Sequence, residues 1–143
     1  MIKQGRRFRY RSLVVMGNGL GAAGFGVGKG QRPRMALLDA RRSCVKDIVM
    51  TSLTRDRGLF HDVMGECNNT KVVIRTAKPG SGLTAGRIVA AVLDCFGIRH
   101  ASAKVIGRRN PFTVVNATFN ALGKHESTAQ LATRRGQRVP FDA

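Results

Sequence analysis

Hydrophobic and polar positions near the start of the chain alternate with a period of two. Arg7, Arg9 and Arg11 fall on one side of the alternation, and two aromatic residues and a serine fall on the other. Successive side chains of a β-strand point to opposite faces, so this pattern predicts a strand that carries a row of arginines. Residues 13–16 are apolar throughout, which predicts that the strand continues with both faces buried.

A glycine-rich hairpin is predicted to follow. Asn18-Gly19 separates the apolar run from a second run at 22–29, and Asn-Gly between two such runs is the strongest short-range hairpin signal. Glycine occupies every second position from 24 to 28, so one face of the second strand has no side chains and another backbone could approach it closely. With the arginine row, this bare face predicts a surface suited to a phosphate backbone.

The rest of the first half is predicted to be a helix from about 35 to 53. Its expected buried face contains Leu37, Ala40, Cys44, Ile48 and Thr51. The opposite face carries Asp39, Arg42 and Lys46, and it suits either RNA contact or simple solvation. Residues 54–58 are polar and end in glycine, which predicts a linker and two domains, 1–57 and 58–143.

The second half combines strands and helices. Strands are predicted at 59–67, 71–77 and 98–107, with a glycine-rich turn at 78–82 and an almost wholly apolar helix at 84–96. Asn110 before Pro111 predicts a capped helix start. Ser127 and Gln130 form a capping box for a last helix that ends at Gly136. The fold class is therefore α+β, with two two-layer subdomains of order β-β-α and β-β-α-β-α-α.

Charge narrows the class of partner. The 143 residues include 25 Lys plus Arg against 8 Asp plus Glu, a formal net charge of +17, and 18 of the basic residues are arginine. The planar guanidinium suits phosphate recognition, so this balance favours nucleic acid over a basic surface that serves only solubility. No run reaches the ~20 apolar residues needed to cross a bilayer, and no membrane partner is expected.

Motifs for catalysis, cofactors or metals are not predicted. The three cysteines (Cys44, Cys67 and Cys95) lack a CxxC pair, which favours small core residues in a reducing compartment. The three histidines (His61, His100 and His125) are scattered, and none pairs with a cysteine or acid at ligand spacing. No metal site and no active site are therefore expected.

Two phosphate-binding motifs match only in part. The spacing of Gly19, Gly21 and Gly24 fits a dinucleotide fingerprint, but the glycines continue at strand period where a helix should open. The end of a P-loop is suggested at 28–30, but Gly30 replaces the hydroxyl residue that would bind magnesium. The turn at 80–82 could hold a phosphate through its N–H groups or could be only a tight strand-to-helix turn.

Several blocks together resemble the universal small-subunit ribosomal protein five family. They are GRRFRYRSLVVMGNGLGAAGFGVGKG at 5–30, KPGSGLTAG at 78–86, AKVIGRRNPFTVVNAT at 103–118 and LATRRG at 131–136. These blocks follow the family's order from end to end. Blocks at 18–25, 59–62 and 124–127 look like those of mitochondrial members, which implies a mitochondrial ribosome, with a bacterial cytoplasm or plastid ribosome as the alternative.

The resemblance implies a first half like double-stranded-RNA-binding domains and a second half of the left-handed βαβ type. It also implies a non-enzymatic role without cofactors: binding small-subunit ribosomal RNA, supporting assembly, and lying near the messenger entry and decoding region beside proteins four and eight. We expect no homo-oligomer. The family's first strand and leading helix would precede Met1.

The expected RNA-binding residues form an N-terminal set and a second cluster. The complete prediction is Lys3, Gly5, Arg6, Arg7, Arg9, Arg11, Asn18 and Lys29, followed by Lys104, Arg108, Arg109 and Asn110. Two departures from the family bear on this set: a single glycine after Gln4, and Arg108-Arg109 where small hydroxyl residues are usual. A third, Arg87 and Ala90 in place of the usual arginine arrangement, bears on the implied contact with protein four. Two other functions stay open, a free-standing double-stranded-RNA-binding regulator and a nucleotide-binding enzyme using the 19–24 motif.

Overall fold

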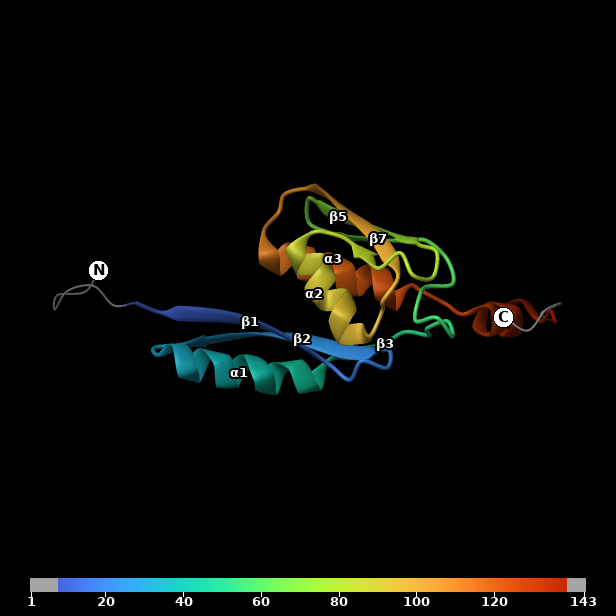
Figure 1. The fold of residues 1–143 in the computed structure, drawn as a ribbon. Coiled ribbons are helices and arrows are strands. Elements are labelled where there is room, and N and C mark those ends of the chain that lie inside the picture. Colours follow the sequence, from blue (N-terminus) through green and yellow to red (C-terminus); the bar gives the residue numbers. More distant parts are fainter. Residues whose placement is uncertain (1–7, 139–143) are drawn as a thin grey trace. The chain divides into compact units, whose positions relative to one another are not determined.

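The fold was analysed in a computed structural model that describes residues 8–138. Its elements are the strands β1 (Tyr10–Gly17) and β2 (Ala22–Gly30), the helix α1 (Pro33–Lys46), the strands β3 (Ile48–Met50), β4 (Val63–Cys67), β5 (Thr70–Thr76) and β6 (Leu83–Thr84), the helix α2 (Arg87–Phe96), the strand β7 (Ala101–Gly107), and the helices α3 (Pro111–Gly123) and α4 (Thr128–Arg135) (Figure 1). The chain divides into two compact units. One contains residues 1–16 and 24–48, and the other contains 17–23 and 49–143. The predicted α+β class with two sheets is confirmed, whereas the predicted domain division at residue 57 stays a prediction.

In the first unit, the glycines of β2 lie against α1. A Cβ atom at Gly24, Gly26 or Gly28 would overlap the main chain of Cys44, Ala40 or Ala36, respectively. These three residues are the buried stripe of α1, and all three are small, so helix and strand backbones come into close contact. The bare glycine face was correctly predicted to allow such an approach. The expectation that this face lies on phosphate was wrong, because α1 occupies it.

Helix α1 is shorter than predicted, and its buried face is only partly the predicted one, because Ala40 and Cys44 are buried as expected but other members of that face are not. It ends at Lys46, and Ile48–Met50 forms β3, the third strand of a sheet with the order β1-β2-β3. Leu37 and Ile48, which we expected to be buried, are 40% and 56% exposed. The small stripe of α1 fits the glycine strand better than large apolar side chains would, and β-branched residues at 48–49 favour a strand over continued helix.

Strand β1 is less buried than the sequence suggested. Its residues from Ser12 to Val15 are half-buried, and Met16 is 45% exposed. The prediction of a strand buried on both faces was therefore wrong. Among the described residues, strand β1 lies at the edge of the order β1-β2-β3, with a neighbouring strand on one side only.

The hairpin turn between β1 and β2 is organised within the second unit. It spans residues 18–21, longer than a two-residue Asn-Gly turn, with positive φ at Gly19 (71°) and Gly21 (101°). The amide of Gly19 donates to Cys95 O (3.1 Å), and that of Gly21 donates to Phe96 O (2.8 Å). The turn is thereby bonded to the carboxyl end of α2.

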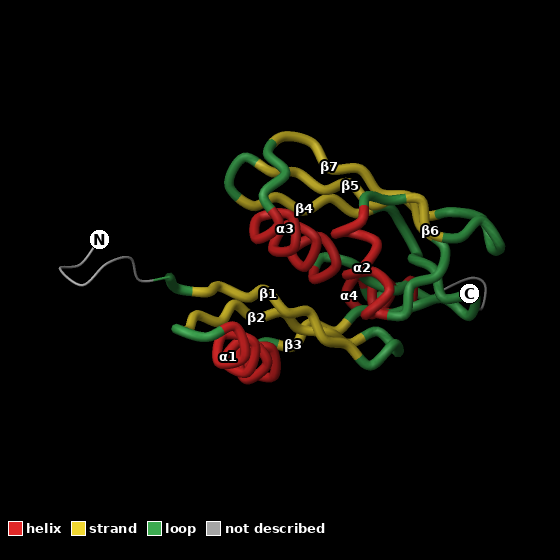
Figure 2. Tube along the Cα trace, turned by 60° about the vertical axis from the view of Figure 1, so that its left-hand side comes forward, coloured by secondary structure: helices red, strands yellow, loops and turns green. Residues whose placement is uncertain are grey.

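The second unit is a four-stranded sheet covered on one face by α2 and α3 (Figure 2). The strand order is β4-β5-β7-β6, with β4, β5 and β7 antiparallel and β6 parallel to β7. Val72 and Ile74 of β5 are fully buried, as are Leu93 and Phe96 of α2. The Phe96 ring contacts that of Phe119 in α3, with centroids 5.3 Å apart. This core leaves the other face of the sheet exposed.

The helix ends of this unit follow the predicted signals. Asn110 Oδ1 accepts from Phe112 N–H (3.2 Å), Ser127 and Gln130 form the capping box, and Gly97 and Gly136 end α2 and α4 with left-handed φ values. Other predicted boundaries were too wide. Strand β4 begins at Val63, α2 begins at Arg87, and β7 begins at Ala101, while the two-residue β6 was missed.

Candidate nucleic-acid interface

The arginine row is described in part. Arg9 and Arg11 are both exposed and lie two residues apart, at the amino end of β1. Strand alternation directs residues two apart to the same side, so the two guanidinium groups can face one phosphate backbone. The other members of the predicted N-terminal set, Lys3, Gly5, Arg6 and Arg7, lie outside the described residues.

Lys29 is exposed near the end of β2, beside a shallow hollow of about 400 Å³. The hollow is shared with α1, whose Met35, Leu38 and Arg42 line it together with one acid, Asp39. Lys29 and Arg42 are therefore brought to the rim of one concave surface. The helix face that carries Arg42 was predicted to suit either RNA contact or simple solvation. In the structure, Arg42 shares this hollow with Lys29, a predicted RNA-binding residue.

Asn18 has a structural task in the hairpin turn. Its Oδ1 accepts from the N–H of Leu20 (2.7 Å) and from that of Ala22 (3.2 Å). The side-chain oxygen is thus committed to the turn, in the way that Asn often supports turns. The amide nitrogen Nδ2 is a donor that could still be offered to a phosphate.

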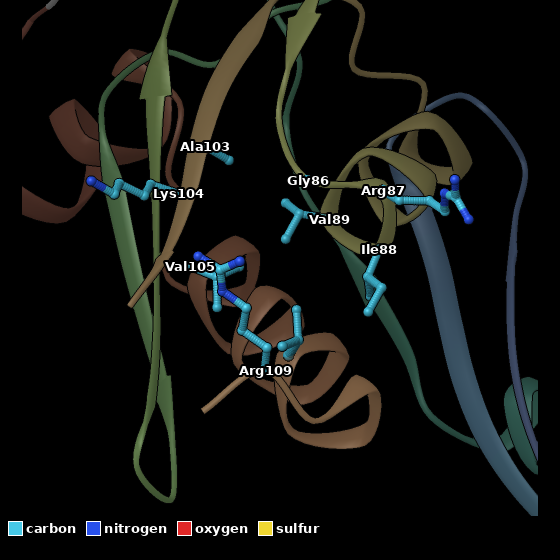
Figure 3. A pocket seen from close by; sticks show the side chains of 9 residues that line it. Gly86, Arg87, Ile88, Val89, Ala103, Lys104, Val105 and Arg109 are labelled. Carbon is cyan, nitrogen blue, oxygen red and sulfur yellow. The ribbon is translucent and has the colours of Figure 1, made fainter. Parts of the chain in front are cut away.

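The second predicted cluster contains four exposed residues, Lys104, Arg108, Arg109 and Asn110. Lys104 and Arg109 both line a hollow of about 330 Å³ beside β7, but their side chains point in different directions (Figure 3). In Figure 3 the Lys104 side chain points to one side of β7, and that of Arg109 lies on the other side, near Val105. The carbonyl of Arg108 accepts from Thr70 Oγ1 (2.7 Å), which fixes the segment between β7 and α3.

Lys104 instead belongs to a basic patch that the sequence analysis missed. The register pairs Val73 with Lys104, Lys71 with Ile106 and Arg75 with Ser102, which places Lys71, Arg75 and Lys104 on the face away from the helices. We call these three residues the outer-face patch. Arg75 and Lys104 share a hollow of about 310 Å³. The alternation of Lys71 and Arg75 was visible in the sequence, but the pairing of β5 with β7 was not.

In the glycine-rich turn, the three N–H groups of residues 80–82 already donate to acceptors within the protein. The amides of Gly80 and Gly82 donate to His100 Nδ1 (3.2 and 3.4 Å), and that of Ser81 donates to Lys78 O (3.0 Å). Helix α2 begins only at Arg87. The alternative that this turn is structural is therefore the one that the geometry favours.

Two of the histidines, predicted to be scattered, are in contact. The rings of His61 and His125 have centroids 4.8 Å apart. His125 Nε2 accepts from Phe60 N–H (2.9 Å), so its Nδ1 carries the proton and donates to Thr51 Oγ1 (2.8 Å). Burial, with His61 beside it, lowers the pKa of His125 to about 4. The cluster joins three distant segments, and helical or strand spacing could not have revealed it.

The structure offers little for redox or metal chemistry. Cys44 is buried as predicted and its Sγ donates to Val14 O (3.0 Å), while Cys67 and Cys95 are half-buried. Burial, with Asp94 beside it, raises the pKa of the Cys95 thiol. Within residues 8–138, no three His, Cys, Asp or Glu side chains gather as metal ligands would. In the same range, no helix has the length and apolar character to cross a membrane.

The many exposed cations favour a nucleic-acid-binding class of protein, whereas an α+β fold alone is compatible with many functions. Comparison with known families identifies the family to which the chain belongs. The model for the N-terminal domain of ribosomal protein S5 matches residues 1–51, and the model for its C-terminal domain matches 65–135. The chain belongs to the ribosomal protein S5 family.

Curated bacterial relatives agree with this assignment. The small ribosomal subunit protein uS5 of Methylorubrum extorquens is 38% identical over 139 residues, which cover 97% of this chain and 72% of the relative. That of Phenylobacterium zucineum is 38% identical over 138 residues, 96% of this chain and 71% of the relative. For the protein of Erythrobacter litoralis, also 38% identical, the chain spans about half of the relative's length, 49%.

Proposed function

We propose that this protein is a structural constituent of the small ribosomal subunit that binds ribosomal RNA and has no catalytic role. The match of both S5 domains, in the family's order and across most of the chain, carries this proposal. The net charge of +17 supports it, because ribosomal RNA is a dense array of phosphates that arginine and lysine neutralise. Binding of this kind would support subunit assembly.

The RNA-binding surface that we propose has three parts. The first is the arginine row (Arg7, Arg9 and Arg11) together with Lys3, Gly5 and Arg6. Of these, Arg9 just before β1 and Arg11 within it are exposed. The second is Lys29, near the end of β2, and we also include Asn18 Nδ2, a separate donor in the hairpin turn. The third is the segment before α3, where Arg108, Arg109 and Asn110 are exposed, together with Lys104 of the outer-face patch. Cations with this exposure pay little desolvation before they meet a phosphate.

Partners and place in the subunit are proposed by family resemblance. Proteins four and eight of the small subunit are the proposed neighbours, messenger RNA passes nearby, and the chain acts as a single copy. The contact with protein four depends on the start of α2, where this chain has Arg87 and Ala90. Arg87 is exposed there, so a basic group is still offered, one turn earlier than the family's arginine.

The proposal also covers the cellular compartment in which the ribosome lies. Blocks at 18–25, 59–62 and 124–127 support a mitochondrial ribosome, whereas the relatives described above are bacterial, which supports the cytoplasm of a bacterium. Immunodetection of the protein in purified mitochondria and in the cytosolic fraction of the source organism separates the two. A bacterial source would exclude the mitochondrial alternative outright.

Sedimentation tests the function itself. A tagged protein in native lysate is expected to co-migrate with the small ribosomal subunit and to leave it only when magnesium chelation dissolves the particle. A ribosomal protein of another family in the same gradient serves as the reference. A peak at the top of the gradient, unchanged by chelation, would refute the ribosomal role and favour a free-standing double-stranded-RNA-binding regulator.

A further inference from the structure

The side of α1 that faces away from β2 carries large aliphatic side chains that stay exposed. Leu38 lies opposite the buried stripe of α1, because it is two residues from Ala36 and two from Ala40 in a helix of about 3.6 residues per turn. Val45 follows Leu38 by seven residues, two turns further along, and shares its direction. Leu38 is 47% exposed and Val45 is 66% exposed. These two side chains therefore present apolar surface to whatever approaches α1.

Two arginines lie on the same line along the helix. Arg34 precedes Leu38 by four residues, Arg41 follows it by three, and both arginines are exposed. Val45 follows Arg41 by a further four residues. Spacings of four, three and four keep residues along one side of a helix, as in the seam of a coiled coil. We call Arg34, Leu38, Arg41 and Val45 the α1 ridge.

The charge of the α1 ridge is not neutralised by the described part of the protein. Helix α1 contains four cations and a single acid, Asp39. Among residues 8–138, neither Arg34 nor Arg41 forms an ion pair with an acid. An acidic surface is the electrostatic complement of such a ridge, and aliphatic groups on that surface would gain from covering Leu38 and Val45. The ridge therefore suits a partner that is both acidic and aliphatic.

Three other occupants fit the α1 ridge less well. RNA would pair with the arginines but would place the exposed aliphatic side chains against sugar and phosphate. Helices that lie on membranes have a broad apolar face, whereas arginines interrupt the aliphatic seam here. A second copy of the chain, docked by the same surface, would bring like charges together. A different protein of opposite charge avoids all three difficulties.

We propose that the α1 ridge is a docking surface for an acidic amphipathic helix of another protein. Aliphatic side chains of that helix would cover Leu38 and Val45, as side chains at heptad spacing do in paired helices. Glutamates or aspartates bordering its apolar seam would meet Arg34 and Arg41. None of the four ridge residues belongs to the RNA-binding surface proposed above. The proposal goes beyond the ribosomal role and does not depend on it.

The test uses the full-length, ¹⁵N-labelled protein and a defined probe, an acetylated and amidated peptide of three Ile-Ala-Ala-Leu-Glu-Gln-Glu repeats. As a helix, this peptide has an aliphatic seam bordered by glutamates. It is expected to shift the amide resonances of Leu38, Arg41 and Val45 in a saturable way. One control peptide has lysine in place of every glutamate, and another has alanine in place of every isoleucine and leucine. Both should bind at least fivefold more weakly.

Two pairs of variants place the site. Val45→Gln removes an aliphatic side chain of the ridge and should weaken the acidic peptide at least fivefold. Leu20→Gln, at a side chain that is 71% exposed in the hairpin turn, should change binding less than twofold. Arg41→Glu should weaken the peptide at least fivefold, whereas Arg55→Glu, the same change at an exposed arginine outside α1, should change binding less than twofold. Circular dichroism checks that each variant keeps the fold.

Any of three results would overturn the proposal. One is an unchanged set of α1 amide resonances at millimolar acidic peptide. The second is binding of the lysine or the alanine peptide as tightly as the acidic one. The third is a double-stranded RNA, or vesicles of anionic lipid, that perturbs Leu38 and Val45 more strongly than the acidic peptide does, which would make the α1 ridge an RNA or a membrane contact.

Discussion

Gly28 of β2 lies against the carbonyl oxygen of Ala36 in α1 so closely that a Cβ atom on residue 28 would overlap it. The same hypothetical atom would overlap Ala40 N. Both neighbours are helix backbone, which cannot move aside as the tip of a side chain could. Close packing of this strand and helix therefore requires glycine at position 28.

Gly28→Ala is expected to destabilise the protein by about 2 kcal/mol or more, because the added methyl group forces β2 and α1 apart. Urea unfolding followed by circular dichroism measures the change. Gly123→Ala is the control, because a Cβ at that position meets only Val49 Cγ1, at 3.9 Å, and the helical site favours alanine. A loss at Gly28 no larger than that at Gly123 would contradict the tight packing of β2 on α1.

The glycines at every second position of β2 show how much of the packing could be predicted from the sequence. Spacing alone predicted that one face of the second strand has no side chains. It could not predict that the helix α1 packs against this face, because that depends on how the chain folds back. Ala36, Ala40 and Cys44 were a usable signal, since three small residues at helical spacing are what a closely packed helix needs. Ala40 and Cys44 were correctly predicted to be buried, but Leu37 was placed in the buried face and Ala36 was not.

The short strands were beyond pattern analysis. Ile48 follows Cys44 by four residues, so it continues the helical spacing even though it lies in β3. Strand β6 has two residues, and only its pairing with β7 makes it a strand. Such pairings are non-local, and neither helical nor alternating periods encode them.

The candidate site was predictable in composition but only partly in arrangement. The exposure of the described arginines and lysines agrees with the charge balance of the sequence, and the cap at Asn110 was visible in the order Asn-Pro. Which cations share the outer face of the sheet depended on strand register, which placed Lys104 with Lys71 and Arg75. Burial of His125 beside His61 likewise depended on contacts between distant segments.

Stability is expected to fall in acid because of His125. Its pKa is about 4 in the fold against an ordinary value of 6.5, so between these values the unfolded chain binds a proton that the folded chain does not. The contribution is fully present above pH 6.5 and is lost as the pH falls toward 4, by up to about 3 kcal/mol. Urea unfolding at intervals from pH 7 to 4 measures the loss.

His125→Gln separates this effect from the titration of carboxylates. The variant cannot bind the proton, so its free energy of unfolding should change less between pH 6.5 and 4 than that of the wild type, although it is less stable at pH 7. A wild-type and variant pH dependence of equal slope would show that His125 is not held neutral by the contacts with Phe60 and Thr51.

Asn110 was predicted to bind RNA, and its side chain caps α3, so two roles must be separated. Asn110→Ala should lower the free energy of unfolding by about 1 kcal/mol, because Phe112 N–H loses its acceptor. Asn110→Ser, which keeps a capping oxygen, should restore most of that stability. If Asn110→Ser binds ribosomal RNA as tightly as the wild type does, the cap is the main role of Asn110, and a weaker affinity at wild-type stability would support direct RNA contact.

Salt dependence tests whether the arginine row touches phosphate. Each cation that neutralises a phosphate contributes close to one unit to the slope of log affinity against log salt, so the double variant Arg9→Gln, Arg11→Gln should reduce that slope by roughly 1.5 to 2 units. Filter binding to small-subunit ribosomal RNA between about 50 and 200 mM salt measures it. Arg134→Gln is the matched control, since that guanidinium already lies 3.2 Å from the Glu126 carboxylate and should leave the slope nearly unchanged. If the double variant does not alter the slope, Arg9 and Arg11 do not contact phosphate. If Arg134→Gln reduces the slope as much as the double variant does, the effect comes from the loss of net charge and not from a contact at Arg9 or Arg11.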